Sequence, residues 1–286
     1  MDLNNITYSH EHVVIDLSKG KNDEDCYLNM FDDALDELKE LYTKGVRRIV
    51  DCSNYGIGVN HDVNRKLEKA TGIEIIDSTG YYKDPFFDKD FEIMNEKELC
   101  NLFVDDILNH GCQIIGEIGT SNNLWTDNEK KLFNAAIKAH KKTNCIIITH
   151  TTLGTLQEEQ VEYFNKHNVN LKKVIISHVA LNNDLEKIKT ILNKGVNVAF
   201  DTIGKNNYLS DETRVKWIKE LIDEGYKKQL LMSMDITRKS HLKKNGGKGY
   251  SYLIDRFVPM LIDGGVKQKD IQTIMCENFE DILRGK

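Results

Sequence analysis

The chain has 286 residues, a formal net charge of −6 and 40% hydrophobic residues, which is enough apolar content for a sizeable core. It carries no basic block and no apolar run of about 18 residues, so nucleic-acid and membrane binding gain no support. Six cysteines form no C-x-x-C pair, and no charged-then-apolar leader precedes the first strand, which is typical of a reduced, cytoplasmic protein. We expect a small-molecule substrate, and a homodimer is left open.

A short apolar run followed by an amphipathic stretch repeats along the whole chain. The apolar runs are predicted strands, and the amphipathic stretches are predicted helices. The predicted strands are residues 6–14, 47–52, 73–79, 113–117, 145–150, 174–178, 196–201 and 230–235. The predicted helices are about 30–42, 63–70, 96–109, 127–143, 157–167, 184–193, 211–224, 250–263 and 268–283.

Eight strand–helix units predict a (β/α)8 TIM barrel that forms one domain over residues 1–286. The continuous apolar strands are typical of parallel strands covered by helices. The alternative is an open doubly wound sheet, which binds ligands at a switch point between a few strands. A barrel explains better why polar residues end strands one, four, five, six and eight, because its active site lies at the C-terminal ends of the strands.

The first predicted strand ends in the motif His10-Glu11-His12. Alternate residues of an extended strand share a face, so His10 and His12 can point at one spot with Glu11 turned away. Two imidazoles on one side of a strand suit a divalent metal such as zinc. Two polar residues near the N-terminus are the alternative interpretation, and the motif alone is weak.

Four later strands end at further candidate metal ligands, namely Glu117, His150, His178 and Asp235. Taken singly, each histidine could be a core residue with satisfied hydrogen bonds, Glu117 an ion-pair partner of a lysine, and Asp235 a helix cap. These alternatives would have to hold together at one end of the barrel. Four histidines and two carboxylates suffice for two divalent metals with a shared carboxylate, which generate a hydroxide nucleophile and polarise a carbonyl or phosphoryl centre.

The ligand pattern and several local strings resemble the phosphotriesterase family of the amidohydrolase superfamily, and most closely its bacterial phosphotriesterase homology proteins. The strings are GEIGTS at 116–121, DTIGK at 201–205, MDITR at 234–238 and SHLK at 240–243. The resemblance runs over roughly residues 5–283 and implies a TIM barrel with two metals. It implies that the buried metal is held by His10, His12 and Asp235, the exposed metal by His150 and His178, and both by a bridging Glu117.

The resemblance also implies roles for the two carboxylates. Many relatives have a carboxylated lysine at the position of Glu117, whereas some homology proteins have a glutamate there, as this chain does. This difference bears on phosphotriester hydrolysis more than on metal binding. Asp235 is implied to be catalytic, because a carboxylate beside the nucleophile can accept its proton and pass it to the leaving group. The alternative is that Asp235 is a metal ligand alone.

The loops after strands seven and eight carry the candidate substrate residues Lys205, Tyr208, Arg238 and His241. In some family members, basic residues in these loops bind the phosphate of phosphorylated sugar lactones, although relatives tend to have tyrosine at position 241. Arginine binds carboxylate or phosphate oxygens as a fork, but an Arg238–Asp pair that fixes the loop is an equal alternative. Tyr82, at the end of strand three, resembles a tyrosine that lines lactonase pockets; a rim aromatic is the alternative.

We therefore predict a hydrolase of an ester-type bond that depends on two divalent metal ions, with zinc as the expected metal. A lactonase acting on a small lactone is favoured, because the basic loops suit an anionic molecule. A phosphorylated sugar lactone as the substrate and weak phosphotriesterase activity are left open. One alternative is a metal-bearing barrel that binds a ligand or partner without turnover. A metal-free barrel enzyme is the third possibility.

Overall fold

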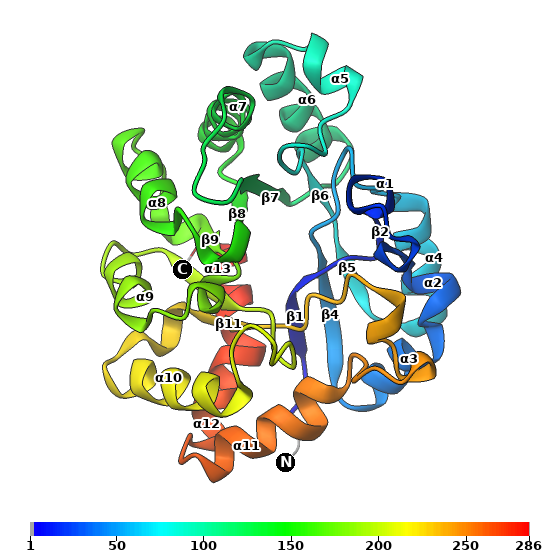
Figure 1. Cartoon of the computed structure of the whole chain (residues 1–286), viewed down its shortest axis with the longest axis vertical. Helices are drawn as coiled ribbons and strands as arrows, with labels where there is room; N and C mark the ends of the chain where they lie inside the picture. The colour runs from blue at the N-terminus through cyan, green and yellow to red at the C-terminus, as the bar shows by residue number, and fades with distance from the viewer. Residues whose placement is uncertain (1–2, 286) are drawn as a thin grey trace.

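Eight parallel strand positions close into the predicted (β/α)8 barrel in the computed structural model, which describes residues 3–285 (Figure 1). The order is β1-β4-β5 followed by β6 to β11, and only Asp77 separates β5 from β6, so these two form one strand position. The barrel closes between β1 and β11, where the Ser9 hydroxyl donates to the Met232 carbonyl at 3.2 Å. The barrel strands are β1 (Ile6–Glu11), β4 (Val46–Asp51), β5 (Glu74–Ile76), β6 (Ser78–Thr79), β7 (Ile114–Thr120), β8 (Ile146–Thr151), β9 (Val174–Ile176), β10 (Asn197–Phe200) and β11 (Leu230–Met232).

Helices surround the strands, and their ends follow local capping signals (Figure 1). The two helices predicted at 96–109 and 127–143 have those bounds, because Asn95 with Glu98 and Thr126 with Glu129 form capping boxes at their N-termini. The outer helices are α3 (Leu35–Thr43), α4 (His61–Thr71), α6 (Glu96–Asn109), α7 (Asp127–Thr143), α8 (Gln157–Lys166), α9 (Leu185–Leu192), α10 (Asp211–Asp223) and α11 (Val258–Asp263). The C-terminal segment continues as α12 (Gln268–Gln272), a π-helical turn Thr273–Glu277 and α13 (Asn278–Arg284).

The segment after β1 differs from the prediction. The predicted strand 6–14 is two strands, because β1 ends at Glu11 and β2 (Val14–Asp16) pairs antiparallel with β3 (Tyr27–Asn29). The break lies at Val13, whose N–H donates to the Asp51 carboxylate at 3.0 Å instead of continuing a barrel ladder. The predicted helix 30–42 is likewise broken into α2 (Met30–Asp33) and α3, and the small helices α1 (Ser18–Lys21) and α5 (Lys89–Ile93) were not predicted.

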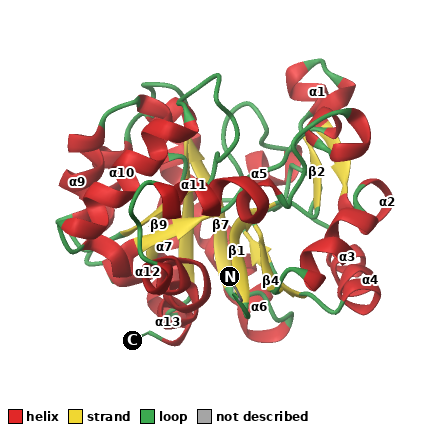
Figure 2. Ribbon diagram, turned by 90° about the horizontal axis from the view of Figure 1, so that it is seen from below, coloured by secondary structure: helices red, strands yellow, loops and turns green. Residues whose placement is uncertain are grey.

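The barrel interior is filled by a cluster of buried apolar side chains. Helix α13 closes one end of the barrel (Figure 2). The Asn278 amide donates to the carbonyls of Lys227 and Leu230, at the beginning of β11. The helix therefore covers the N-terminal ends of the strands, and the C-terminal ends are left for the site. Among residues 3–285, no helix is long and apolar enough to cross a membrane. The inner cluster is Val50, Cys52, Ile76, Ile114, Ile146, Ile148, Ile175, Ala199 and Leu231, with Phe279 and Ile282 of α13.

The strands before His178 and Asp235 end earlier than predicted. The strand predicted at 174–178 ends at Ile176, and the strand predicted at 230–235 ends at Met232. His178 and Asp235 then adopt left-handed backbone conformations, with φ of 60° and 50°, which non-glycine residues rarely adopt. Both side chains therefore come from turns just beyond the strands, and such strained positions cluster at functional sites.

Candidate metal centre and active site

The His10-Glu11-His12 motif places its side chains as strand alternation predicts. His10 and His12 are fully buried at the C-terminal end of β1. Glu11 points to the other side, where its carboxylate accepts from the Ser233 hydroxyl at 2.7 Å and from the Met234 N–H at 2.8 Å. Glu11 thus holds the chain after β11 against β1, beside the two histidines.

A single carboxylate, that of Glu117 on β7, lies among four imidazoles. Its Oε2 is 3.3 Å from His10 Nε2, 3.2 Å from His150 Nδ1 and 3.3 Å from His178 Nε2. Its Oε1 is 3.5 Å from His12 Nε2. The structure therefore brings together histidines from the ends of β1, β8 and β9 around one glutamate.

Asp235 joins the cluster from the turn after β11. Its Oδ1 lies 3.5 Å from His12 Nε2, and its Oδ2 forms an ion pair with the Lys205 ammonium. Burial would raise the pKa of Asp235, but the ammonium of Lys205 and the imidazole of His12 outweigh it and hold this pKa below its usual range. Asp235 is thus an ionised carboxylate at the edge of the cluster.

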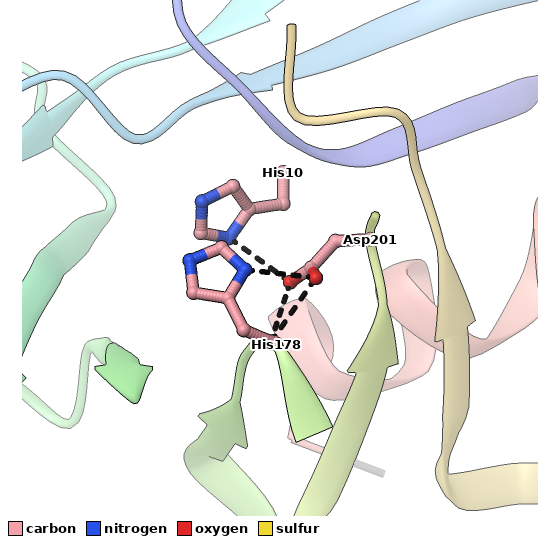
Figure 3. A group of neighbouring side chains, drawn as sticks. All are labelled: His10, His178 and Asp201. Atoms are coloured by element: carbon pink, nitrogen blue, oxygen red, sulfur yellow. Dashed lines mark hydrogen bonds and ion pairs between the residues drawn. The ribbon is translucent and has the colours of Figure 1, made fainter. Parts of the chain in front are cut away.

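Asp201, directly after β10, is a buried member of the site that the sequence interpretation did not assign (Figure 3). Its carboxylate accepts from the His178 backbone N–H at 3.1 Å and lies 2.9 Å from His178 Nδ1. It also lies 3.6 Å from His10 Nδ1. The available signal was the same as for the candidate ligands, a polar side chain at the end of a predicted strand.

The cluster fits a pair of divalent metals. The Nε2 atoms of His10 and His12 are buried and have no hydrogen-bond partner among the described residues, which is costly unless a ligand occupies the space between them. Their Nδ1 atoms face the hydroxyls of Ser177 at 2.9 Å and Ser53 at 3.2 Å. Metal-binding histidines use one ring nitrogen for the metal and the other for such a partner.

Two groups of potential ligand atoms share Glu117, and this sharing corresponds to the predicted bridge. The groups are His10 with His12 and Glu117, and His150 with His178 and Glu117. A third group, of His10, His178 and Asp201, has ligand spacing too. Asp201 contacts the Nδ1 atoms of both rings, whereas their Nε2 atoms face Glu117, so Asp201 is better described as orienting the rings.

The charges within the cluster compensate one another. Burial would raise the pKa of Glu117, but the imidazoles of His150 and His10 hold it well below its usual range. Burial would lower the pKa of His178, but the Asp201 carboxylate raises it well above its usual value. At His150 burial prevails and lowers the pKa to about 4, although Glu117 opposes the shift. The Glu117 carboxylate is therefore ionised at neutral pH.

A cavity of about 440 Å³ opens above the cluster, and all five predicted substrate residues line it. The Tyr82 hydroxyl lies 3.2 Å from His150 Nδ1, and Tyr208 is 45% exposed at the mouth. Arg238 also lines the cavity, but its guanidinium pairs with Asp23 at 2.6 Å, which is the loop-fixing contact considered as the alternative. Its role in substrate binding stays a prediction, as do the roles of the others. The predicted lining residues are Tyr82, Lys205, Tyr208, Arg238 and His241.

The sequence model of the phosphotriesterase family matches residues 2–283 of this chain. The chain belongs to the phosphotriesterase family. It is 40% identical over 280 residues to the phosphotriesterase homology protein of Escherichia coli, with 95% of each protein covered. It is 30% identical over 277 residues to an N-acetyltaurine hydrolase of Danio rerio, covering 89% of this chain and 78% of that protein. The chain is therefore a hydrolase of this family, and the resemblance drawn from its motifs is confirmed.

Solved structures in the family share the fold closely. The crystal structure of the Escherichia coli homology protein, complexed with phosphate in its active site, has a TM-score of 0.94 at 38% identity. The match covers 99% of this chain and 100% of the Escherichia coli protein. A lactonase from Listeria monocytogenes has a TM-score of 0.89 at 25% identity, covering 99% of this chain and 94% of that one. These likenesses extend over the whole barrel.

We expect Asp201→Asn to weaken metal binding about 10- to 100-fold, because His178 and His10 lose the charged partner that orients their rings. Competition with a metal-sensitive chelator measures this affinity without any substrate. Asp77→Asn is the matched control, since Asp77 is a buried carboxylate that bonds to Asn64 and Arg65 outside the cavity. Equal metal affinity in Asp201→Asn and Asp77→Asn would contradict the orienting role.

Proposed function

We propose that this chain hydrolyses an ester-type bond in a small anionic molecule, with a lactone as the favoured substrate and two zinc ions as the favoured metals. The proposal rests on one observation above all, the Glu117 carboxylate within 3.5 Å of four imidazoles at the base of a cavity. Imidazole and carboxylate ligands suit zinc. Bound divalent metals would supply a hydroxide nucleophile at neutral pH and polarise the scissile carbonyl.

The chain's own residues have separate roles in this proposal. His10, His12 and Asp235 would hold the buried metal, His150 and His178 the exposed one, and Glu117 both. The ionised Asp235 carboxylate can accept the proton released on attack and pass it to the leaving oxygen. The hydroxyl of Tyr82, beside His150, lies where it can contact the substrate.

An anionic substrate is favoured by the charges on the cavity wall. The wall contains the cations of Lys21, Lys83, Lys205 and Arg238, while its carboxylates, Glu117 and Asp235, belong to the cluster that would be neutralised by metals. A phosphate lies in the active site of the Escherichia coli relative, and another relative is a lactonase. A phosphorylated sugar lactone combines both features, and weak phosphotriesterase activity would follow from the same nucleophile.

An amide with an anionic tail is the second candidate. The Danio rerio relative is an N-acetyltaurine hydrolase, and taurine carries a sulfonate that the same cationic wall could bind. The nucleophile that attacks a lactone carbonyl can attack an amide carbonyl, but the poorer leaving group then depends more on the proton from Asp235.

The six cysteines are free, and we propose a cytoplasmic location.

A kinetic screen with metal-loaded protein tests the proposal. The panel contains plain and phosphorylated sugar lactones, N-acetyltaurine and a phosphotriester, with kcat/KM measured for each. Preference for the phosphorylated lactone is expected. Hydrolysis of N-acetyltaurine alone would favour the second candidate. Two bound metals without hydrolysis of any panel member would instead favour a metal-bearing barrel that binds without turnover.

Complete removal of metal is expected to abolish turnover of every active panel member, because the bound metals would supply both the hydroxide nucleophile and the polarisation of the scissile carbonyl. Dialysis against a chelator, followed by metal analysis and assay, measures this. Addition of zinc should restore activity, whereas magnesium should not, since magnesium prefers oxygen ligands. Activity that persists in protein free of metal would show that the mechanism is wrong.

A further inference from the structure

Lys83, which the sequence interpretation did not select, lines the cavity directly after Tyr82. It lies on the loop after β6, while Lys205 lies on the loop after β10, four strand positions away in an eight-strand barrel. These two cations therefore lie on opposite walls of the cavity. The predicted cationic loops account for one wall, and Lys83 makes the other wall positive as well.

The cations on the first wall already have carboxylate partners. Arg238 pairs with Asp23 at 2.6 Å and lies 3.4 Å from Asp25, and Lys205 pairs with Asp235. A substrate anion at Arg238 would have to compete with two carboxylates. Binding there would therefore gain less than binding at a cation without a partner.

Lys83 is partly buried and forms no ion pair within residues 3–285. Its ammonium donates to the Asp84 carbonyl at 2.8 Å, so two of its three N–H donors stay available. The Asp84 carboxylate favours the charged ammonium only from beyond ion-pair distance, and it accepts from the Thr126 hydroxyl at 2.6 Å. Lys21, the other cavity lysine without an ion pair in the described chain, is exposed and therefore solvated by water.

The position of the Lys83 ammonium is defined by aromatic rings and by the backbone of β7. It lies 5.6 Å from the ring centre of Tyr82 and 5.7 Å from that of Phe86. The stem packs on Gly119, where an added Cβ would lie 3.2 Å from Lys83 Cβ and Cδ and 3.1 Å from His150 Cβ. The ammonium is thus held on the same side of the cavity as His150.

We propose that Lys83 is the residue that binds the anionic group of the substrate, a phosphate, sulfonate or carboxylate, on the β6 side of the cavity. This assignment rests on the proposed function for the identity of the substrate, but not for the existence of the anion site. Burial lowers the pKa of Lys83, because the charged ammonium loses stabilisation by water. An anion bound beside the ammonium would stabilise that charge again. Lys83 is then a specificity determinant, because an uncharged lactone would leave it without a partner.

Lys83→Met keeps the apolar stem and removes the charge, and Lys83→Arg keeps the charge. Lys131→Met is the matched control, since the Lys131 ammonium also donates to backbone carbonyls, of Phe91 and Met94, and lies 4.1 Å from the ring centre of Phe91, outside the cavity. Arg238→Met tests the competing assignment. The substrates are a plain sugar lactone and the same lactone with a phosphate group.

We expect Lys83→Met to raise KM for the phosphorylated lactone roughly 10- to 100-fold, as the loss of a charge-assisted hydrogen bond implies, with KM for the plain lactone unchanged. Lys83→Arg and Lys131→Met should stay near wild type. An unchanged KM in Lys83→Met, an equal rise for both lactones, or a selective rise in Arg238→Met alone would overturn the proposal.

Calorimetry with the phosphorylated open-chain hydroxy acid gives a readout that needs no turnover. The dissociation constant should rise by a similar factor in Lys83→Met and not in Lys131→Met. If wild type hydrolyses neither lactone, the proposed function fails while this measurement still decides on Lys83. No binding to the wild type, or equal binding to Lys83→Met, would overturn the anion site.

Discussion

Glu117→Gln is expected to lose bound metal and to lower kcat by more than about 100-fold. Substitution of a residue that only hydrogen-bonds to a metal ligand typically costs up to about 100-fold, and the loss of a shared ligand should exceed that. An amide has nearly the shape of the carboxylate but carries no charge. The four imidazoles within 3.5 Å of the Glu117 carboxylate would lose its negative charge, and two metal ions could no longer share it as a ligand. Metal content per chain, measured by mass spectrometry, and kcat on the best panel substrate check this result.

Glu129→Gln is the control for Glu117→Gln. Glu129 is also fully buried, but it accepts from the Ser121 hydroxyl and the Thr126 N–H and caps α7. Its substitution should cost about 0.5–2 kcal/mol of unfolding free energy as a lost cap, with metal content retained. A Glu117→Gln protein that keeps two metals and near-normal kcat would contradict the bridging role.

Asp235→Asn is expected to lower kcat by about 10²- to 10⁴-fold, the range for loss of a general acid–base. An asparagine oxygen can still face His12 and a metal, but it cannot accept a proton. The loss should therefore persist in excess zinc and should grow for esters with poorer leaving groups. A series of esters that differ in leaving-group pKa measures this dependence.

Recovery of Asp235→Asn in excess zinc would show that Asp235 is a ligand alone, the alternative left open by the sequence. The same would follow from a leaving-group dependence equal to that of wild type. Asp223→Asn, at an exposed ion pair with Lys219 on α10, is the control for an acid-to-amide change and should behave as wild type.

The sequence by itself determined the barrel fold and the kinds of side chain in its candidate site, namely histidines and carboxylates. Strand and helix periods depend on local side-chain alternation, and the helix caps at Asn95 and Thr126 depend on neighbours within three residues. The alternation in His10-Glu11-His12 also predicted which side chains share a face. These features are readable because each depends on a short stretch of chain.

Only the tertiary structure decided how charges pair across the site. Glu11 bonds to Ser233, 222 residues later, and Arg238 pairs with Asp23, 215 residues earlier, because barrel closure and loop packing bring these segments together. No local period encodes such contacts. The left-handed turn at Asp235 and the position of the Lys83 ammonium, which forms no ion pair within residues 3–285, are likewise consequences of packing. The sequence interpretation therefore selected the side chains of the cluster but did not select Lys83.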